Sequence, residues 1–141
     1  MTSDSLDVLN ELLHLQYCSL PRYLTYGSPW EHRGNDDASV TVRRMAEDHE
    51  RMSRRVAGFI YEQGGIPDSG EFPIDFAELH FLSLDYLLNE IVYYQRRELA
   101  EIKRLAEQAA SDPQTLALVE ETLGAEKAHL EDLEKFLQQP A

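Results

Sequence analysis

The stretch GAEKAHLEDL, residues 124–133, places a carboxylate on an otherwise apolar helix face. Helical spacing puts Glu126 in line with Leu123 and Leu130, and His129 follows one turn later on an adjoining face. Burying such groups without partners costs on the order of several kcal/mol. The rest of the chain is therefore expected to supply a bound cation or hydrogen-bonding partners.

Length and composition describe one globular domain, residues 1–141, with an apolar fraction of 43%. The formal charge of −13 argues against nucleic acid as a partner, since an acidic surface repels phosphate. Cys18 is the only cysteine, which excludes an internal disulfide and fits a reducing compartment. The start MTSDSLDVLN lacks the regions of a signal peptide, and no apolar run is long enough to span a membrane. These features predict a cytoplasmic protein without a membrane partner.

Four stretches show helical periodicity, and no stretch shows the sustained alternation typical of strands. Stop signals follow the first two stretches, at Gly27 and Pro29 and then at GGIP, where Gly64 or Gly65 can adopt the left-handed conformation. The predicted helices are about residues 3–26, 37–63, 83–110 and 113–137.

Two further signals refine these helices. Asp112 is the expected N-cap of the fourth helix, with Pro113 in its first turn. Pro21 is expected to kink the first helix, because it frees the carbonyl of Tyr17.

The connections between these helices predict their arrangement. A tight turn joins the third and fourth helices, and about ten residues join the first and second, so each pair forms an antiparallel hairpin. About twenty residues separate the second and third helices, and DFAELH within them is expected to form a helical turn. The prediction is an all-α, four-helix bundle of two hairpins joined by a long crossover.

Each predicted helix has an inner stripe that is apolar except near its middle. Glu98 and Glu126 both lie 14 residues from Asp112, at the turn of the second hairpin, so they are expected at one level. In the first hairpin, Gln16 and His49 lie at about equal distances along the chain from His32, in the middle of the connection. The four polar side chains are therefore expected to converge in the bundle centre.

Such a cluster fits a metal site, because Glu126 and His129 lie three residues apart on one helix face. Without metal, His49 could instead be a core histidine hydrogen-bonded to Glu126, or one carboxylate could be protonated. Both interpretations follow from the same residues.

Three segments resemble the ferritin-like superfamily, with bacterioferritins and rubrerythrins as the nearest members. They are LNELLHLQYCSLPRYL (9–24), AEDHERMSRRVAGFIYEQGGIP (46–67) and GAEKAHLEDLEKFL (124–137). The resemblance implies a ferritin-like bundle with a di-iron site, formed by one carboxylate from each of the first and third helices and a Glu-x-x-His motif from each of the other two. The last segment carries the one specific motif.

Applied to the residues of this chain, the resemblance implies a degenerate di-iron site, in which some of the family's ligands are replaced. Glu126 and His129 keep the fourth-helix motif, and Glu98 supplies the third-helix carboxylate. Gln16 replaces the first-helix carboxylate, while His49 and Met52 stand where the second-helix motif is expected. The implied centre is one Fe, Zn or Mn ion bound by His49, Glu98, Glu126 and His129, with Gln16 at most hydrogen-bonding a ligand or water. No haem is expected, because Met52 occupies the place of an iron-ligand histidine.

Three functions follow from these expectations. The first is a metal-binding protein whose ion reacts with oxygen or peroxide, which would make the chain an oxidoreductase. The second is a metal-free relative that serves as a dimeric scaffold or binding module. Iron storage in a cage ranks last, because the chain lacks the short fifth helix of bacterioferritin shells. The family further implies a homodimer formed through the flanks of the first two helices.

Overall fold

The computed structural model describes residues 1–26 and 36–138, and these residues form helices and no strand. The all-α prediction is confirmed, while the predicted stop at Gly27 and Pro29 lies outside the described residues. None of the described helices combines the length and the apolar run that a membrane crossing requires. The elements are α1 (Ser3–Tyr17), α2 (Leu20–Thr25), α3 (Asp36–Glu62), η1 (Ile74–Phe81), α4 (Leu84–Gln108) and α5 (Pro113–Leu137).

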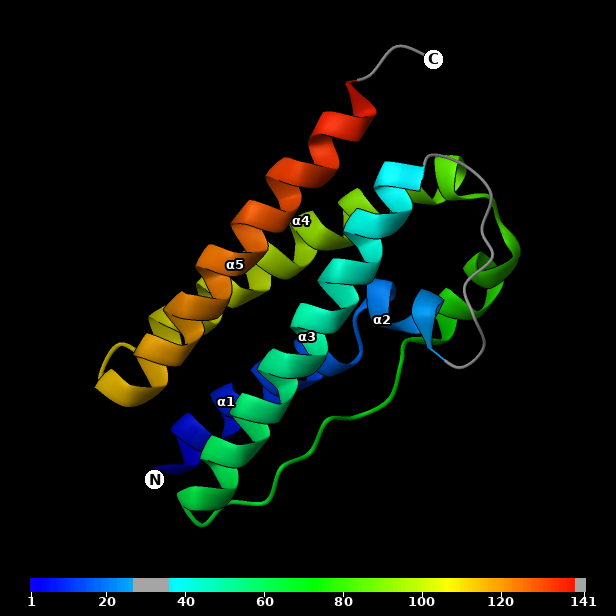
Figure 1. Ribbon diagram of the computed structural model, residues 1–141. Coiled ribbons are helices and arrows are strands. Elements are labelled where there is room, and N and C mark those ends of the chain that lie inside the picture. The colour runs from blue at the N-terminus through cyan, green and yellow to red at the C-terminus, as the bar shows by residue number, and fades with distance from the viewer. Residues whose placement is uncertain (27–35, 139–141) are drawn as a thin grey trace.

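The helices pack as two hairpins joined by one crossover. α1 and α2 lie against α3, and α4 lies against α5. The segment between α3 and α4 carries the chain back along the bundle, so that these two helices run in the same direction (Figure 1). The 3-10 helix η1 forms in this segment, where DFAELH predicted a helical turn. The predicted topology is confirmed.

Helix ends follow the predicted signals. Asp112 caps α5 by accepting a hydrogen bond from the Thr115 amide at 3.3 Å. Its other carboxylate oxygen accepts from Ser5 Oγ of α1 at 2.7 Å, which ties the second hairpin to the first. These hydrogen bonds, first that from Ser5, lower the pKa of Asp112. At the end of α3, Gly64 takes the left-handed conformation with φ of 86°.

The first predicted helix is broken rather than kinked. α1 ends at Tyr17, and Ser19 adopts an extended conformation as the N-cap of α2. Pro21 explains the break, because its ring has no N–H and conflicts with the carbonyl four residues earlier, that of Tyr17. This carbonyl instead accepts a hydrogen bond from the Arg22 guanidinium. The prediction of one continuous helix from 3 to 26 was therefore wrong at this point.

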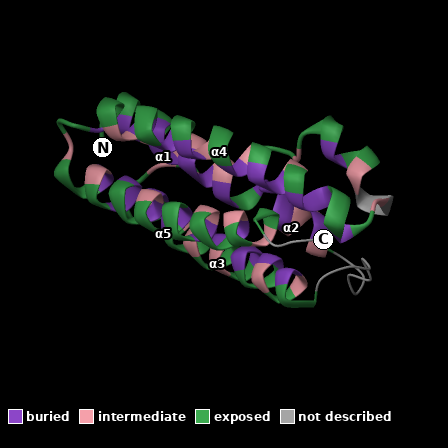
Figure 2. Cartoon of the chain, turned by 90° about the horizontal axis from the view of Figure 1, so that it is seen from above, coloured by how far each residue is buried: buried purple, intermediate pink, exposed green. Residues whose placement is uncertain are grey.

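Buried polar side chains divide the apolar core into two clusters. Figure 2 shows the buried residues on the facing sides of the helices. The α1 cluster comprises Val8, Leu9, Leu12, Leu13, Val56, Ile60, Ile102, Leu105, Ala109, Leu118 and Val119. The α2 cluster comprises Leu20, Leu24, Ala38, Val42, Met45, Phe76, Leu84, Leu87, Leu88, Ile91, Val92 and Leu133. Between them lies a polar layer of Gln16, Ser19, His49, Ser53, Gln95, Thr122, Glu126 and His129.

We predict that Asp112→Ala destabilises the bundle by about 1–2 kcal/mol, since it removes the cap of α5 and the bond from Ser5. Urea denaturation followed by circular dichroism measures the change. Asp132→Ala is the control on the same helix, because Asp132 pairs with the surface residue Lys135 at 3.7 Å and caps no helix. The control should change stability by less than about 0.5 kcal/mol. Equal effects of the two substitutions would contradict the assigned role of Asp112.

Candidate metal centre

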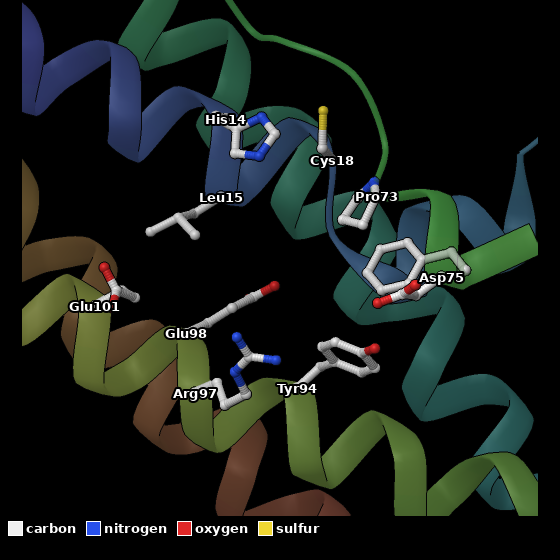
Figure 3. Close-up of a pocket in the computed structure, with 10 residues that line it drawn as sticks. His14, Leu15, Cys18, Pro73, Asp75, Tyr94, Arg97, Glu98 and Glu101 are labelled. Carbon is white, nitrogen blue, oxygen red and sulfur yellow. The ribbon is translucent and has the colours of Figure 1, made fainter.

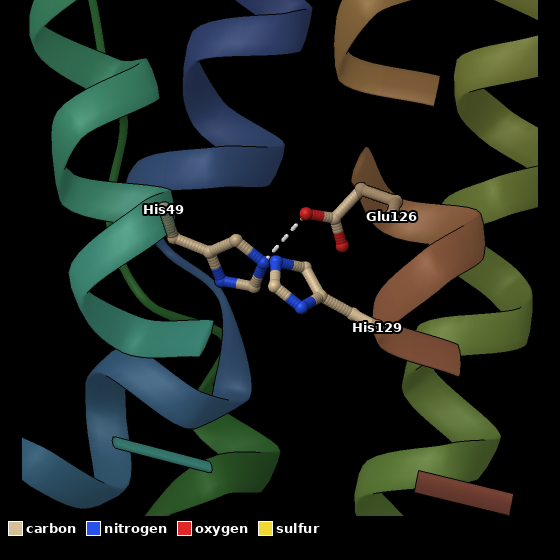
Figure 4. A group of neighbouring side chains, drawn as sticks. All are labelled: His49, Glu126 and His129. Carbon is tan, nitrogen blue, oxygen red and sulfur yellow. Dashed lines mark hydrogen bonds and ion pairs between the residues drawn. The ribbon is translucent and has the colours of Figure 1, made fainter. Parts of the chain in front are cut away.

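Glu126 and two histidines meet in the middle of the polar layer. His49 extends from α3, while Glu126 and His129 extend from successive turns of α5 (Figure 4). One nitrogen of each ring and one carboxylate oxygen all lie within 4.8 Å of one another. His49 is 0% exposed and Glu126 is 1% exposed. The structure thus brings together three of the four predicted ligands.

Both ring nitrogens of His49 have partners. Nε2 lies 2.7 Å from Glu126 Oε1, and Nδ1 lies 2.7 Å from the Ser19 hydroxyl. Burial alone would lower the pKa of His49, but the charge of Glu126 and the hydrogen bond to it raise that pKa above its ordinary value. Without metal, the arrangement is that of a histidinium paired with a carboxylate. Ser19 reaches this ring because of the break between α1 and α2.

Gln95 of α4 binds the remaining oxygen of Glu126. Its side-chain amide donates to Oε2 at 2.5 Å and to the Glu126 carbonyl at 3.1 Å. Burial would raise the pKa of Glu126, yet the His49 charge and the hydrogen bonds from His49 and Gln95 lower it. A carboxylate is thus tolerated among leucines because each of its oxygens has a donor.

His129 has fewer partners than His49. Its ring meets the His49 ring edge-on, with centroids 5.8 Å apart. Nε2 lies 3.2 Å from Asp48 Oδ2, but this buried nitrogen makes no hydrogen bond among the described residues. Burial lowers the pKa of His129, so the neutral ring with a free lone pair is favoured. A neutral imidazole is the form that binds metal.

Glu98, the fourth predicted ligand, lies outside this three-residue group. It extends from α4 into a separate pocket of about 240 Å³, between Leu15 and Tyr94 (Figure 3). Its Oε2 is buried and has no hydrogen-bond partner among the described residues. Burial raises the pKa of Glu98 to about 8. Its role as a metal ligand therefore stays a prediction.

Gln16, the neutral amide that replaces the family's first-helix carboxylate, lies beside Glu126 and His129. It is 1% exposed, and it lines a pocket of about 160 Å³ together with Met52, Glu126 and His129. Its Nε2 has no hydrogen-bond partner among the described residues. Met52 is half-buried and packs against the α1 cluster.

Sequence reasoning missed two residues of the centre, Ser19 and Gln95. Equal counting from Asp112 favoured Glu98, which follows Gln95 by three residues on the same helix. The two helices are staggered, and Gln95 is the residue that faces Glu126. Ser19 could have been found from Pro21, since a proline in a first turn predicts an N-cap just before it.

The donor set fits a divalent ion. Two imidazoles and one carboxylate are ligands that Zn, Fe and Mn accept, and three protein ligands leave coordination positions open. The unpartnered His129 nitrogen is the observation of this structure that a metal would explain.

We predict that Glu98→Gln reduces the loss of stability with rising pH. The unfolded carboxyl ionises near 4.5, whereas the folded one stays protonated up to about pH 8. The folded state thus binds more protons in this window, and its stability falls as pH rises through it. The amide should remove this loss and stabilise the metal-free protein by on the order of 1–3 kcal/mol above pH 8.

Urea denaturation in chelator, between about pH 5 and 8.5, measures the difference between wild type and variant. Glu107→Gln, at an exposed position of the same helix, is the matched control and should leave the slope unchanged. Parallel curves for wild type and Glu98→Gln would show that Glu98 is not a buried neutral acid.

No protein-family model matches the chain, and no curated protein matches it significantly. Among solved structures, the chain is similar to the bacterioferritin-related protein from Bacteroides fragilis, described as a dodecameric thioferritin. The superposition has a TM-score of 0.72 at 24% sequence identity, and it covers 94% of this chain and 83% of that chain. With its two helical hairpins and its crossover, the chain has the ferritin-like fold.

Proposed function

We propose that this chain is a ferritin-like metal-binding protein with one divalent ion bound by His49, Glu126 and His129. The observation that carries the proposal is the convergence of three ligand atoms within 4.8 Å in a buried layer. The unpartnered nitrogen of His129 supports it, since a buried polar atom without a partner costs about 1–3 kcal/mol.

The neighbours of the three ligands suit metal binding. A metal at Nε2 of His49 would take the place of the proton shared with Glu126, and the proton on Nδ1 would stay in place. The Ser19 hydroxyl can accept from this Nδ1–H with or without metal, so it orients the ring in both states. Gln95 fixes the second oxygen of Glu126 and leaves the first directed at the histidines.

Iron is the first candidate for this ion, because the structural neighbour is named a ferritin and the donor set suits iron. Bound iron would supply one-electron chemistry toward oxygen or peroxide, and an oxidoreductase role for the chain rests on it. Glu98, the predicted fourth ligand, could reach the ion only if its side chain moved, because its carboxylate lines another pocket.

A metal-free binding module is the second candidate, and one observation favours it. His49 and Glu126 already satisfy each other, with Ser19 and Gln95 as further partners. Such a network needs no ion to be stable in the core. Metal-dependent stability separates the two candidates.

We predict that Fe(II), Zn or Mn stabilises the wild type by about 2.7 kcal/mol at a hundredfold excess over its dissociation constant. Glu126→Gln should remove most of this response, because the amide oxygen is a weaker ligand. Glu126→Leu should remove all of it. Thermal melts in chelator and in each metal, anaerobic for Fe(II), measure the response.

Glu131→Gln is the control, since Glu131 is exposed on the same helix, and it should keep the full response. The metal proposal fails if no metal shifts the wild-type melt. If Glu126→Leu also raises the metal-free melting temperature, the metal-free module is the better description.

We further propose that the chain forms a homodimer through the outer faces of α1 and α3. Support comes from the family resemblance and from exposed apolar residues on these helices, among them Tyr17 and Tyr61. The expected light-scattering mass is that of two chains. A mass of twelve chains would instead match the dodecamer of the structural neighbour, and a monomer would likewise contradict the dimer.

A further inference from the structure

A pocket opens directly onto the proposed metal site. It has a volume of about 160 Å³, and Gln16, Glu126 and His129 line it together with Met52 and the surface residue Ala125. Two of these residues are proposed ligands, so a molecule in the pocket lies next to the ion. The volume is enough for several water-sized groups, since one water occupies about 30 Å³ in the liquid.

Gln16 gives this pocket an unused hydrogen-bonding group. The residue is 1% exposed, and its Nε2 has no hydrogen-bond partner among the described residues. An amide buried without a partner is unfavourable by about 1–3 kcal/mol, so a bound molecule that accepts its hydrogen bond would relieve that penalty. Gln16 comes from α1 and faces the two α5 ligands across the pocket.

The charges around the pocket favour an anion when the ion is present. Arg51 bonds to Asp48 and Arg55 bonds to Glu121, so these four surface charges cancel. Among the three proposed ligands, Glu126 is the one carboxylate that meets the two positive charges of a divalent ion. A net positive charge remains at the site, and a monovalent anion would neutralise it.

We propose that the pocket binds a small monovalent anion as an external ligand of the metal, with the Gln16 amide as its hydrogen-bond donor. This inference rests on the proposed metal site and adds the chemical class of its ligand. A carboxylate at position 16 would repel such an anion, whereas the isosteric amide donates a hydrogen bond to it. Gln16 is thus a specificity-determining residue rather than a metal ligand.

Azide titration of the Co(II)-loaded protein tests the proposal, because the visible absorption of Co(II) reports changes of its ligands. Azide is expected to change the wild-type spectrum with saturation. Gln16→Met has nearly the same shape but no amide, and it should weaken azide binding about tenfold while leaving Co(II) affinity unchanged. Gln63→Met, at an exposed position of the chain, should behave like the wild type.

Ala125→Leu provides a second variant that does not alter a buried residue. Its larger side chain fills the pocket from the surface and should weaken azide binding at least tenfold, again without changing Co(II) affinity. Gln16→Glu should abolish azide binding, because the carboxylate repels the anion.

The outcomes separate this inference from the metal proposal. If Co(II) binds but azide leaves the spectrum unchanged, or binds all variants equally well, the anion pocket is disproved and the metal site stands. If the wild type does not bind Co(II), both proposals are overturned.

Discussion

The contact between His49 and Glu126 is the constraint on which the centre of the bundle depends. Two ionisable side chains lie 2.7 Å apart where neither is reached by bulk water. Their attraction in the core is opposed by the loss of hydration, so such a pair contributes little net stability. Removing one partner is nevertheless costly, because the other remains buried without a counter-charge. The pair therefore fixes the relative position of α3 and α5 more than it strengthens the fold.

Most of the fold could be predicted from the sequence because its signals are local. Asp112 needs only its own helix to act as a cap, and the apolar stripes need only helical periodicity. The same periodicity explains α4, where Ile91, Gln95 and Ile102 are buried on one face and Tyr93 is 52% exposed.

The site was harder to predict, because it depends on distances between helices. Glu98 and Gln95 differ by less than one turn, and only the stagger of α4 against α5 decides which of them meets Glu126. Ser19 contacts His49 across 30 positions of sequence, and only after the chain leaves α1 and starts α2. Helical periodicity says which residues face inward, but it carries no information about axial shifts or about such a break.

Because the polar layer lies between two apolar clusters, residues of the metal centre can change while both clusters keep their residues. Each apolar cluster is built without residues of the polar layer, so the bundle keeps both of its hydrophobic contacts whatever the layer contains. Glutamine and glutamate have nearly the same volume, and an exchange at Gln16 or Gln95 changes the charge of the layer by one while the packing around it stays the same. Single substitutions in the layer therefore change its charge and its possible ligands without removing a residue from either apolar cluster, and their cost is that of a buried charge or polar group left without a partner.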